Sequence, residues 1–131
     1  MKFPIIVFEK DDKIMYALDY PFLMGDKRFI DVGFKKVTMI DSHGNVFNVD
    51  GVLQDSGLLL WQSIKLAGLI VKLKPIIKGD VGKIRLETLK ERVMRHVKSN
   101  SANWSSIDAP NRIERRVEKA KNFEELIRIF K

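Results

Sequence analysis

The stretch LLLWQSIKLAGLIVKLKPII, residues 58–77, decides the fold class, because apolar and polar side chains alternate along both of its halves. We expect the chain to fold back at Ala67-Gly68. Two antiparallel strands, Leu58–Leu66 and Leu69–Ile77, then pair with each other. Side chains along a strand point alternately to opposite faces, and this period of two favours strands here over a helix.

The register of this hairpin separates an apolar face from a basic one. In this register Gln62 lies opposite Leu73. Ile64 lies opposite Val71, and a one-residue slip would mix the two sets of side chains. We expect Ile64, Val71 and Leu73 to be buried beneath the helices that follow. The other face carries a tryptophan, a serine and three lysines, namely Trp61, Ser63, Lys65, Lys72 and Lys74.

Two more hairpins precede this one in the chain. The first joins Phe3–Glu9 to Lys13–Asp19 through a turn at Asp11-Asp12. The second joins Val37–Asp41 to Asn45–Leu53. Three hairpins in succession predict an antiparallel sheet.

The turn of the second hairpin is expected at Ser42-His43-Gly44-Asn45, whose glycine can take a positive φ. This turn pairs Ile40 with Phe47 on one face of the hairpin. The segment Gln54–Gly57 then leads into the central hairpin. Residues 22–35, which contain two glycines, are expected to form a loop with a short helical turn.

After Pro75 the apolar period changes to that of a helix. A first helix begins near Leu86, although no good N-cap residue precedes it. Four residues form its apolar side: Leu86, Leu89, Val93 and Val97. The polar segment Ser99–Asn103 ends this helix.

Two shorter helices are expected after that break. One runs from Asp108 or Ala109 to Lys121, with Pro110 in its first turn. Asn122 and Glu125 resemble a capping box that begins the other. Its apolar side consists of Phe123, Leu126, Ile127 and Phe130, and that of the preceding helix consists of Ile113, Val117 and Ala120.

A run of strands followed by helices is typical of an α+β domain. We therefore predict a single domain over residues 1–131, with strands mainly in residues 1–78 and helices mainly in residues 84–131. Its antiparallel sheet would contain about six strands from the three hairpins, with two to three C-terminal helices packed on one face.

Composition narrows the setting in which the protein works. The chain has no cysteine, which removes disulfides, thiolate metal ligands and a cysteine nucleophile, and which suits a reducing cytosol. The apolar run at the N-terminus is too short for a signal peptide. No stretch approaches the ~20 apolar residues of a membrane span. We therefore expect a cytoplasmic protein with no membrane partner.

The net charge of +7 is unevenly distributed. Residues 1–66 contain 8 Lys and Arg against 9 Asp and Glu, whereas residues 67–131 contain 16 against 8. Such a basic half can bind nucleic acid, bind an acidic protein partner, or do no more than keep the protein soluble.

No pattern in the chain points to catalysis, a metal or a cofactor. His43 lies at an expected turn tip and His96 borders the apolar side of the first helix, and neither has partners at metal-ligand spacing. The segment Gly79–Lys83 has the wrong glycine spacing for a phosphate-binding loop. Ser105-Ser106 lies in no nucleophile elbow. We expect a protein that is not an enzyme and needs no cofactor.

Two sets of side chains remain as candidate binding faces. Trp61, Lys65, Lys72 and Lys74 could stack bases and neutralise phosphates, although solvent-facing strands often carry lysines anyway. The aspartates of the N-terminal half could instead form an acidic face for a partner: Asp11, Asp12, Asp41, Asp50 and Asp55.

The chain resembles the immunity proteins of bacterial polymorphic and contact-dependent toxin systems. The resemblance lies in the short hairpins, the absence of cysteine, a helix of the type Leu86-Glu87-Thr88-Leu89-Lys90 and an ending like Asn122-Phe123-Glu124-Glu125-Leu126-Ile127. It implies a non-enzymatic cytoplasmic protein that binds and blocks one toxin domain. It carries over no binding residues. Inhibitors of basic nuclease toxins are usually acidic, so this basic chain would meet an acidic toxin surface or use its aspartate-bearing turns.

The sequence is therefore compatible with three functions. The favoured one is a protein-binding inhibitor whose partner is a toxin domain. The second is a nucleic-acid-binding module that uses the basic face around Trp61. The third is a small domain with only a structural or interaction role.

Overall fold

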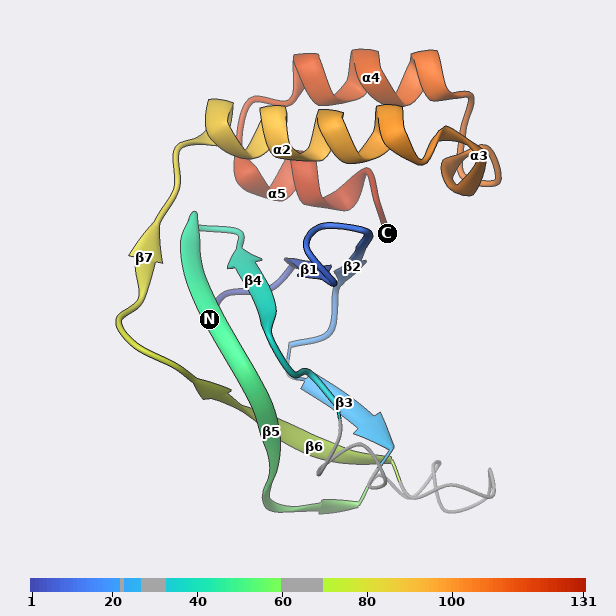
Figure 1. Ribbon diagram of the computed structural model, residues 1–131. Helices are drawn as coiled ribbons and strands as arrows, with labels where there is room; N and C mark the ends of the chain where they lie inside the picture. Colours follow the sequence, from blue (N-terminus) through green and yellow to red (C-terminus); the bar gives the residue numbers. More distant parts are fainter. Residues whose placement is uncertain (22, 27–32, 60–69) are drawn as a thin grey trace.

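A computed structural model describes residues 1–21, 23–26, 33–59 and 70–131 of the chain. It shows an α+β domain in which helices lie against one end of a curled antiparallel sheet (Figure 1). The strands are β1 (Ile5–Glu9), β2 (Ile14–Leu18), β3 (Leu23–Asp26), β4 (Val37–Asp41), β5 (Asn45–Leu59), β6 (Ile70–Ile77) and β7 (Gly82–Lys83). The helices are α2 (Leu86–Ser99), α3 (Ser101–Trp104), α4 (Pro110–Lys119) and α5 (Phe123–Arg128). The predicted fold class is confirmed.

The strands follow the order β2-β1-β4-β5-β6-β3, and β7 pairs with β5. The predicted β1–β2 hairpin is confirmed, with Glu9 opposite Ile14. Strand β5 holds the sheet together, because its first part pairs with β4 and its later part with β6. Within the pairing of β5 with β6 the register shifts between Val49 and Val52, where Gly51 has a φ of 113°. Such a shift bends a strand and increases its twist, so the sheet curls along β5.

The sheet has a hydrophobic core on each side. The first core lies between the helices and β1, β2 and β4, and it includes Ile6, Phe8, Met15, Ile40, Leu89, Val93, Ile113, Val117, Leu126 and Ile127. The second core lies inside the curl of the sheet and comprises Ile5, Val7, Leu23, Val37, Met39, Phe47, Val49, Val52 and Leu73. Strand β1 therefore alternates between two buried faces, as expected of an interior strand.

The pairing of β5 with β6 is antiparallel, but the predicted register is wrong. Leu73 lies opposite Gln54 rather than Gln62, and the predicted loop Gln54–Gly57 lies within β5. Leu73 is buried in the core inside the curl, not beneath the helices. The apolar and polar residues of β5 also alternate before the predicted loop. This earlier part of β5 can therefore pair with β6 as well as the predicted partner can.

Part of the predicted central hairpin lies outside the described residues. This applies to its turn at Ala67-Gly68 and to Trp61, Ile64 and Lys65. It applies as well to the side chain of Val71.

The β4–β5 hairpin forms where expected, with a register one residue away from the prediction. Met39, not Ile40, lies opposite Phe47. The turn is a three-residue loop that ends at Gly44 with a φ of 78°, and the Gly44 N–H donates to the carbonyl of Asp41. Both faces of β4 are buried, so its apolar pattern does not distinguish the two registers.

Strand β3 was missed by the prediction of a loop over residues 22–35. It pairs with β6 along Leu23–Asp26. A Cβ on Gly25 would lie 2.7 Å from Cδ1 of Leu73, so any larger residue here would force the buried Leu73 side chain to shift. A four-residue strand that contains glycine lacks the alternation from which strands are predicted.

The three predicted helices form as α2, α4 and α5, but the predicted break Ser99–Asn103 is mostly helical, because α2 includes Ser99 and α3 begins at Ser101. In α2 the buried apolar residues are Leu89, Val93 and Val97, and Arg85 precedes it without a side-chain cap. Pro110 occupies the first turn of α4. The Asn122 side chain accepts a hydrogen bond from the Glu125 N–H at 2.8 Å and caps α5. Helices α2 and α4 run side by side, with α5 on the sheet side of them (Figure 1).

Candidate functional site

The described part of the predicted basic face lies on the outer surface of β5 and β6. Lys72 and Lys74 are two residues apart in β6 and point away from the core that buries Leu73. Leu53 of β5 lies directly opposite Lys74 and therefore on the same face. Ile76 continues this face along β6.

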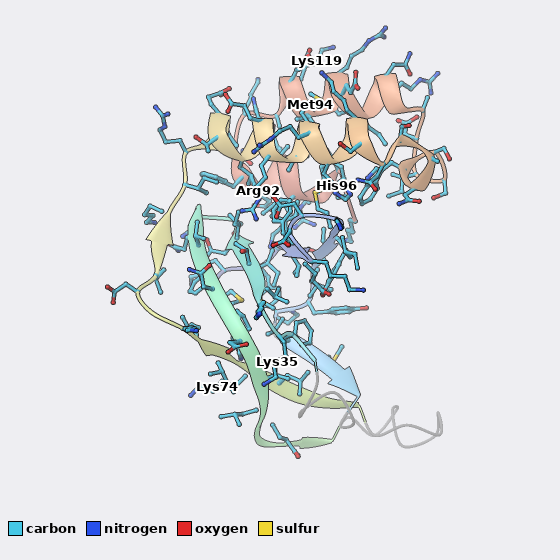
Figure 2. All side chains as sticks on the ribbon, viewed as in Figure 1. Lys35, Lys74, Arg92, Met94, His96 and Lys119 are labelled. Carbon is cyan, nitrogen blue, oxygen red and sulfur yellow. The ribbon has the colours of Figure 1, made fainter. Side chains whose placement is uncertain are left out.

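Lys35 completes the same surface from the segment before β4. A Cβ on Gly51 would lie 3.3 Å from Nζ of Lys35 and 3.5 Å from Cδ1 of Ile76, so both side chains cover the bend in β5. Figure 2 shows Lys35 and Lys74 over β5 and β6, far from the helices. We call these five residues the β5–β6 outer face: Lys35, Leu53, Lys72, Lys74 and Ile76.

Two aliphatic side chains of this face are open to solvent. Leu53 is 54% exposed and Ile76 is 39% exposed. An apolar centre with a charged rim is the composition of a protein interface, and single aliphatic side chains of this kind also occur on ordinary surfaces.

The structure brings together half of the predicted basic face and adds three residues. Lys72 and Lys74 share one side of β6 as predicted, while Trp61 and Lys65 lie outside the described residues. Leu53, Ile76 and Lys35 were not selected from the sequence. The position of Leu53 next to Val52 in a strand could have indicated its exposure. Val52 is buried, and successive side chains of a strand point to opposite faces.

Of the four predicted aspartates whose side chains the structure describes, two remain open to a partner. Asp11 is exposed in the β1–β2 turn and Asp50 is partly buried on β5. Asp12 and Asp41 are both engaged by other parts of the chain, as described below. The side chain of Asp55 lies outside the described part of the structure.

Asp12 and two side chains of α2 hold the β1–β2 turn against the helix. Arg92 donates to the two carboxylate oxygens of Asp12 at 2.7 and 2.5 Å, and its guanidinium lies 4.1 Å from the centre of the Phe8 ring. His96 is buried, with Nδ1 2.8 Å from the Asp12 carbonyl oxygen. Its ring also meets Trp104 edge-on. Figure 2 shows Arg92 and His96 on the sheet side of α2.

Asp41 is fully buried at the turn between β4 and β5. Its carboxylate accepts backbone N–H bonds from Lys2, His43 and Asn45 at 2.9–3.0 Å and a side-chain bond from Asn45 at 3.0 Å. Burial works against ionisation, but these hydrogen bonds outweigh it and hold the pKa of Asp41 below its usual value. Asp41 thus organises the turn and is closed to a partner.

The structure also has two concavities, one remote from the β5–β6 outer face and one that meets it at Lys35. One, of about 630 Å³, runs between α2 and α4 over Met94 and Val117, and its rim mixes glutamates with basic residues. The other, of about 490 Å³, lies between the β1–β2 turn and β3. In it the Tyr16 hydroxyl donates to Glu9 at 2.6 Å. Burial and the Glu9 carboxylate raise the pKa of Tyr16, so the phenol keeps its proton.

Comparison with known proteins adds no relative to this picture. No protein-family model matches the chain, and neither a curated protein nor a solved structure does. Among the described residues, no group of three His, Cys, Asp or Glu side chains could hold a metal ion. In the same part of the chain, no helix has the length and apolar character to cross a membrane. The surfaces formed by the described residues are therefore the basis for assigning a function.

Proposed function

We propose that this chain is a non-enzymatic protein-binding protein and that its partner docks on the β5–β6 outer face. The observation that carries this proposal is the exposure of Leu53 and Ile76 on a regular, paired part of the sheet. The strands fix both side chains, so a partner that covers them orders little of the chain and gains apolar burial.

The lysines around this apolar centre define the chemistry of the partner. Lys35 and Lys74 are exposed and carry positive charge at its edge. An acidic surface is complementary to them and would be steered towards this face. The described part of the face is aliphatic and contains no aromatic side chain. Aliphatic side chains stack poorly on bases, which favours a protein over nucleic acid as the partner.

A toxin domain is the partner class that we favour. The resemblance of the first helix and of the Asn122–Ile127 ending to immunity proteins supports it. The +7 charge and the lysines of this face favour an acidic toxin surface. In this proposal the chain acts in the cytoplasm and blocks the toxin by covering that surface.

The test begins with the gene neighbourhood of this chain: the product of a toxin gene found there is titrated against the purified protein by calorimetry. Leu53→Asp and Ile76→Asp should each weaken binding by a factor of ~100, because each substitution places a negative charge against the acidic surface of the partner. Val81→Asp is the matched control, since Val81 is 50% exposed in the β6–β7 connection. It should bind like the unaltered chain.

Two results would contradict the proposal. Equal affinity of all three variants would remove the β5–β6 outer face as the docking site. A neighbouring gene product that does not bind the chain would remove the toxin as the partner class.

A further inference from the structure

Helix α4 carries a separate basic surface on one flank. Four cations occupy positions i, i+3, i+4 and i+7, which fall within one narrow arc of a helix. We call them the α4 basic stripe: Arg112, Arg115, Arg116 and Lys119. All four side chains are exposed, and the buried side of α4 is formed by Ile113 and Val117.

The acidic residues of α4 lie on its other flank. Glu118 lines the groove towards α2, and its carbonyl accepts a hydrogen bond from Lys90 at 3.1 Å. Glu114 is one turn away from Glu118 on the same side. With ~100° of rotation per residue, the α4 basic stripe therefore points away from α2 and is not neutralised by its own helix.

Most of the stripe makes no ion pair within the described residues. Arg112 lies 3.8 Å from Asp108, whereas Arg115, Arg116 and Lys119 have no such partner there. Two other arginines of the chain do make close ion pairs: Arg128 reaches both Asp19 and Glu124, and Arg92 reaches Asp12. The described residues thus leave the charge of Arg115, Arg116 and Lys119 unneutralised.

We infer that the α4 basic stripe binds the phosphate backbone of nucleic acid without reading its sequence. Three of its four cations are arginines, whose planar guanidinium matches phosphate oxygens in pairs. The stripe covers about 10 Å of helix, a length over which duplex DNA presents about six phosphate charges. Asn111, the one amide side chain of α4, lies outside this arc, and cations held on phosphates fix the position of a protein on the duplex without reading its bases.

This inference does not rest on the proposed function, because α4 and the β5–β6 outer face lie at different ends of the molecule (Figure 1). An acidic protein could also be drawn to the stripe. Nucleic acid is favoured because its charges are regular and dense, whereas carboxylates on a protein surface are scattered.

The test is fluorescence anisotropy of a labelled duplex DNA of mixed sequence with the full chain, at about 50 mM and about 200 mM salt. With four phosphate contacts the log–log slope should be about −3.6, so affinity should fall about 100-fold between these conditions. The triple variant Arg115→Gln, Arg116→Gln, Lys119→Gln should lower affinity at the lower salt at least 30-fold and reduce the slope to about −1.

The control removes the same charge from the other surface. The variant Lys35→Gln, Lys72→Gln, Lys74→Gln should change DNA affinity by less than about threefold, since these lysines are remote from α4. Circular dichroism melts check that both variants are folded.

Three outcomes would overturn the inference. The first is an equal loss of DNA affinity in both triple variants, which would show that binding depends only on the net charge of the chain. The second is no binding at the lower salt. The third is tighter binding of labelled poly-glutamate than of DNA, which would assign the stripe to an acidic protein.

Discussion

Asp41 shows how a single residue can be read wrongly from its type. An aspartate next to a glycine-containing turn is expected to be solvated, yet this carboxylate is buried and accepts four hydrogen bonds. It ties the start of the chain at Lys2 to the β4–β5 turn. Three of the four donors are backbone groups, whose positions no side-chain pattern reveals.

The depressed pKa of Asp41 makes part of the folding stability dependent on pH. The folded-state pKa lies below the unfolded value of about 3.9, so the contribution is complete above about pH 4 and disappears as the pH falls through the folded-state pKa. Asp41→Asn should therefore lower the free energy of unfolding at pH 6 by about 1–3 kcal/mol. This deficit should shrink steadily below about pH 4 in urea titrations. A deficit that stays constant with pH would show that the charge contributes nothing.

Arg92 acts at the same scale by joining α2 to the β1–β2 turn. Its guanidinium is bound by the Asp12 carboxylate and stacks over Phe8. Arg92→Ala should cost about 1–2 kcal/mol of unfolding free energy, measured by urea denaturation. Arg95→Ala, an exposed change in the same helix, should cost less than about 0.5 kcal/mol. Equal effects of the two substitutions would contradict a specific clamp.

At the scale of whole elements, α5 should stabilise the domain in spite of its terminal position. Leu126, Ile127 and Phe130 are buried in the core beneath the helices. Leu126→Ala should therefore lower the free energy of unfolding by about 2–4 kcal/mol, and deletion of residues 122–131 should lower the melting temperature further. Lys121→Ala is the control and should melt like the unaltered chain. An unchanged melting temperature after the deletion would mean that α5 is a free partner-binding segment.

The helices were predictable because each buries only one side. In α2 and α5 the apolar residues recur at helical spacing and match the buried residues. Strand β4 buries both sides, so a slip of one residue keeps its apolar residues buried, and the register at Phe47 had to come from the turn. The register of Leu73 depended on a bend at Gly51, where the backbone departs from regular pairing.

The candidate site was only partly predictable for the same reason. Lys72 and Lys74 follow from alternation within one strand. Leu53 joins them only through the register of β5 with β6, which places it opposite Lys74. Lys35 joins from a separate segment that crosses the bend in β5. Contacts between segments that are far apart in the chain leave no pattern in the sequence, so this surface could not be predicted from the sequence.

At the scale of the whole molecule, the domain presents two basic surfaces on different layers. The β5–β6 outer face combines lysines with exposed aliphatic side chains, which suits an acidic protein. The α4 basic stripe lacks the apolar centre and suits phosphates. Six of the sixteen Lys and Arg residues of the basic half, residues 67–131, lie on these two surfaces.

The most direct test of the central claim, that a protein partner docks on the β5–β6 outer face, is lysine footprinting of the complex. Acetylation rates are measured by mass spectrometry for the free chain and for the chain bound to its partner. Lys35 and Lys74 should be protected in the complex, while Lys98 and Lys119 on the helices should react as in the free chain. Protection of Lys98 and Lys119 with unchanged rates at Lys35 and Lys74 would contradict the claim and move the interface to the helices.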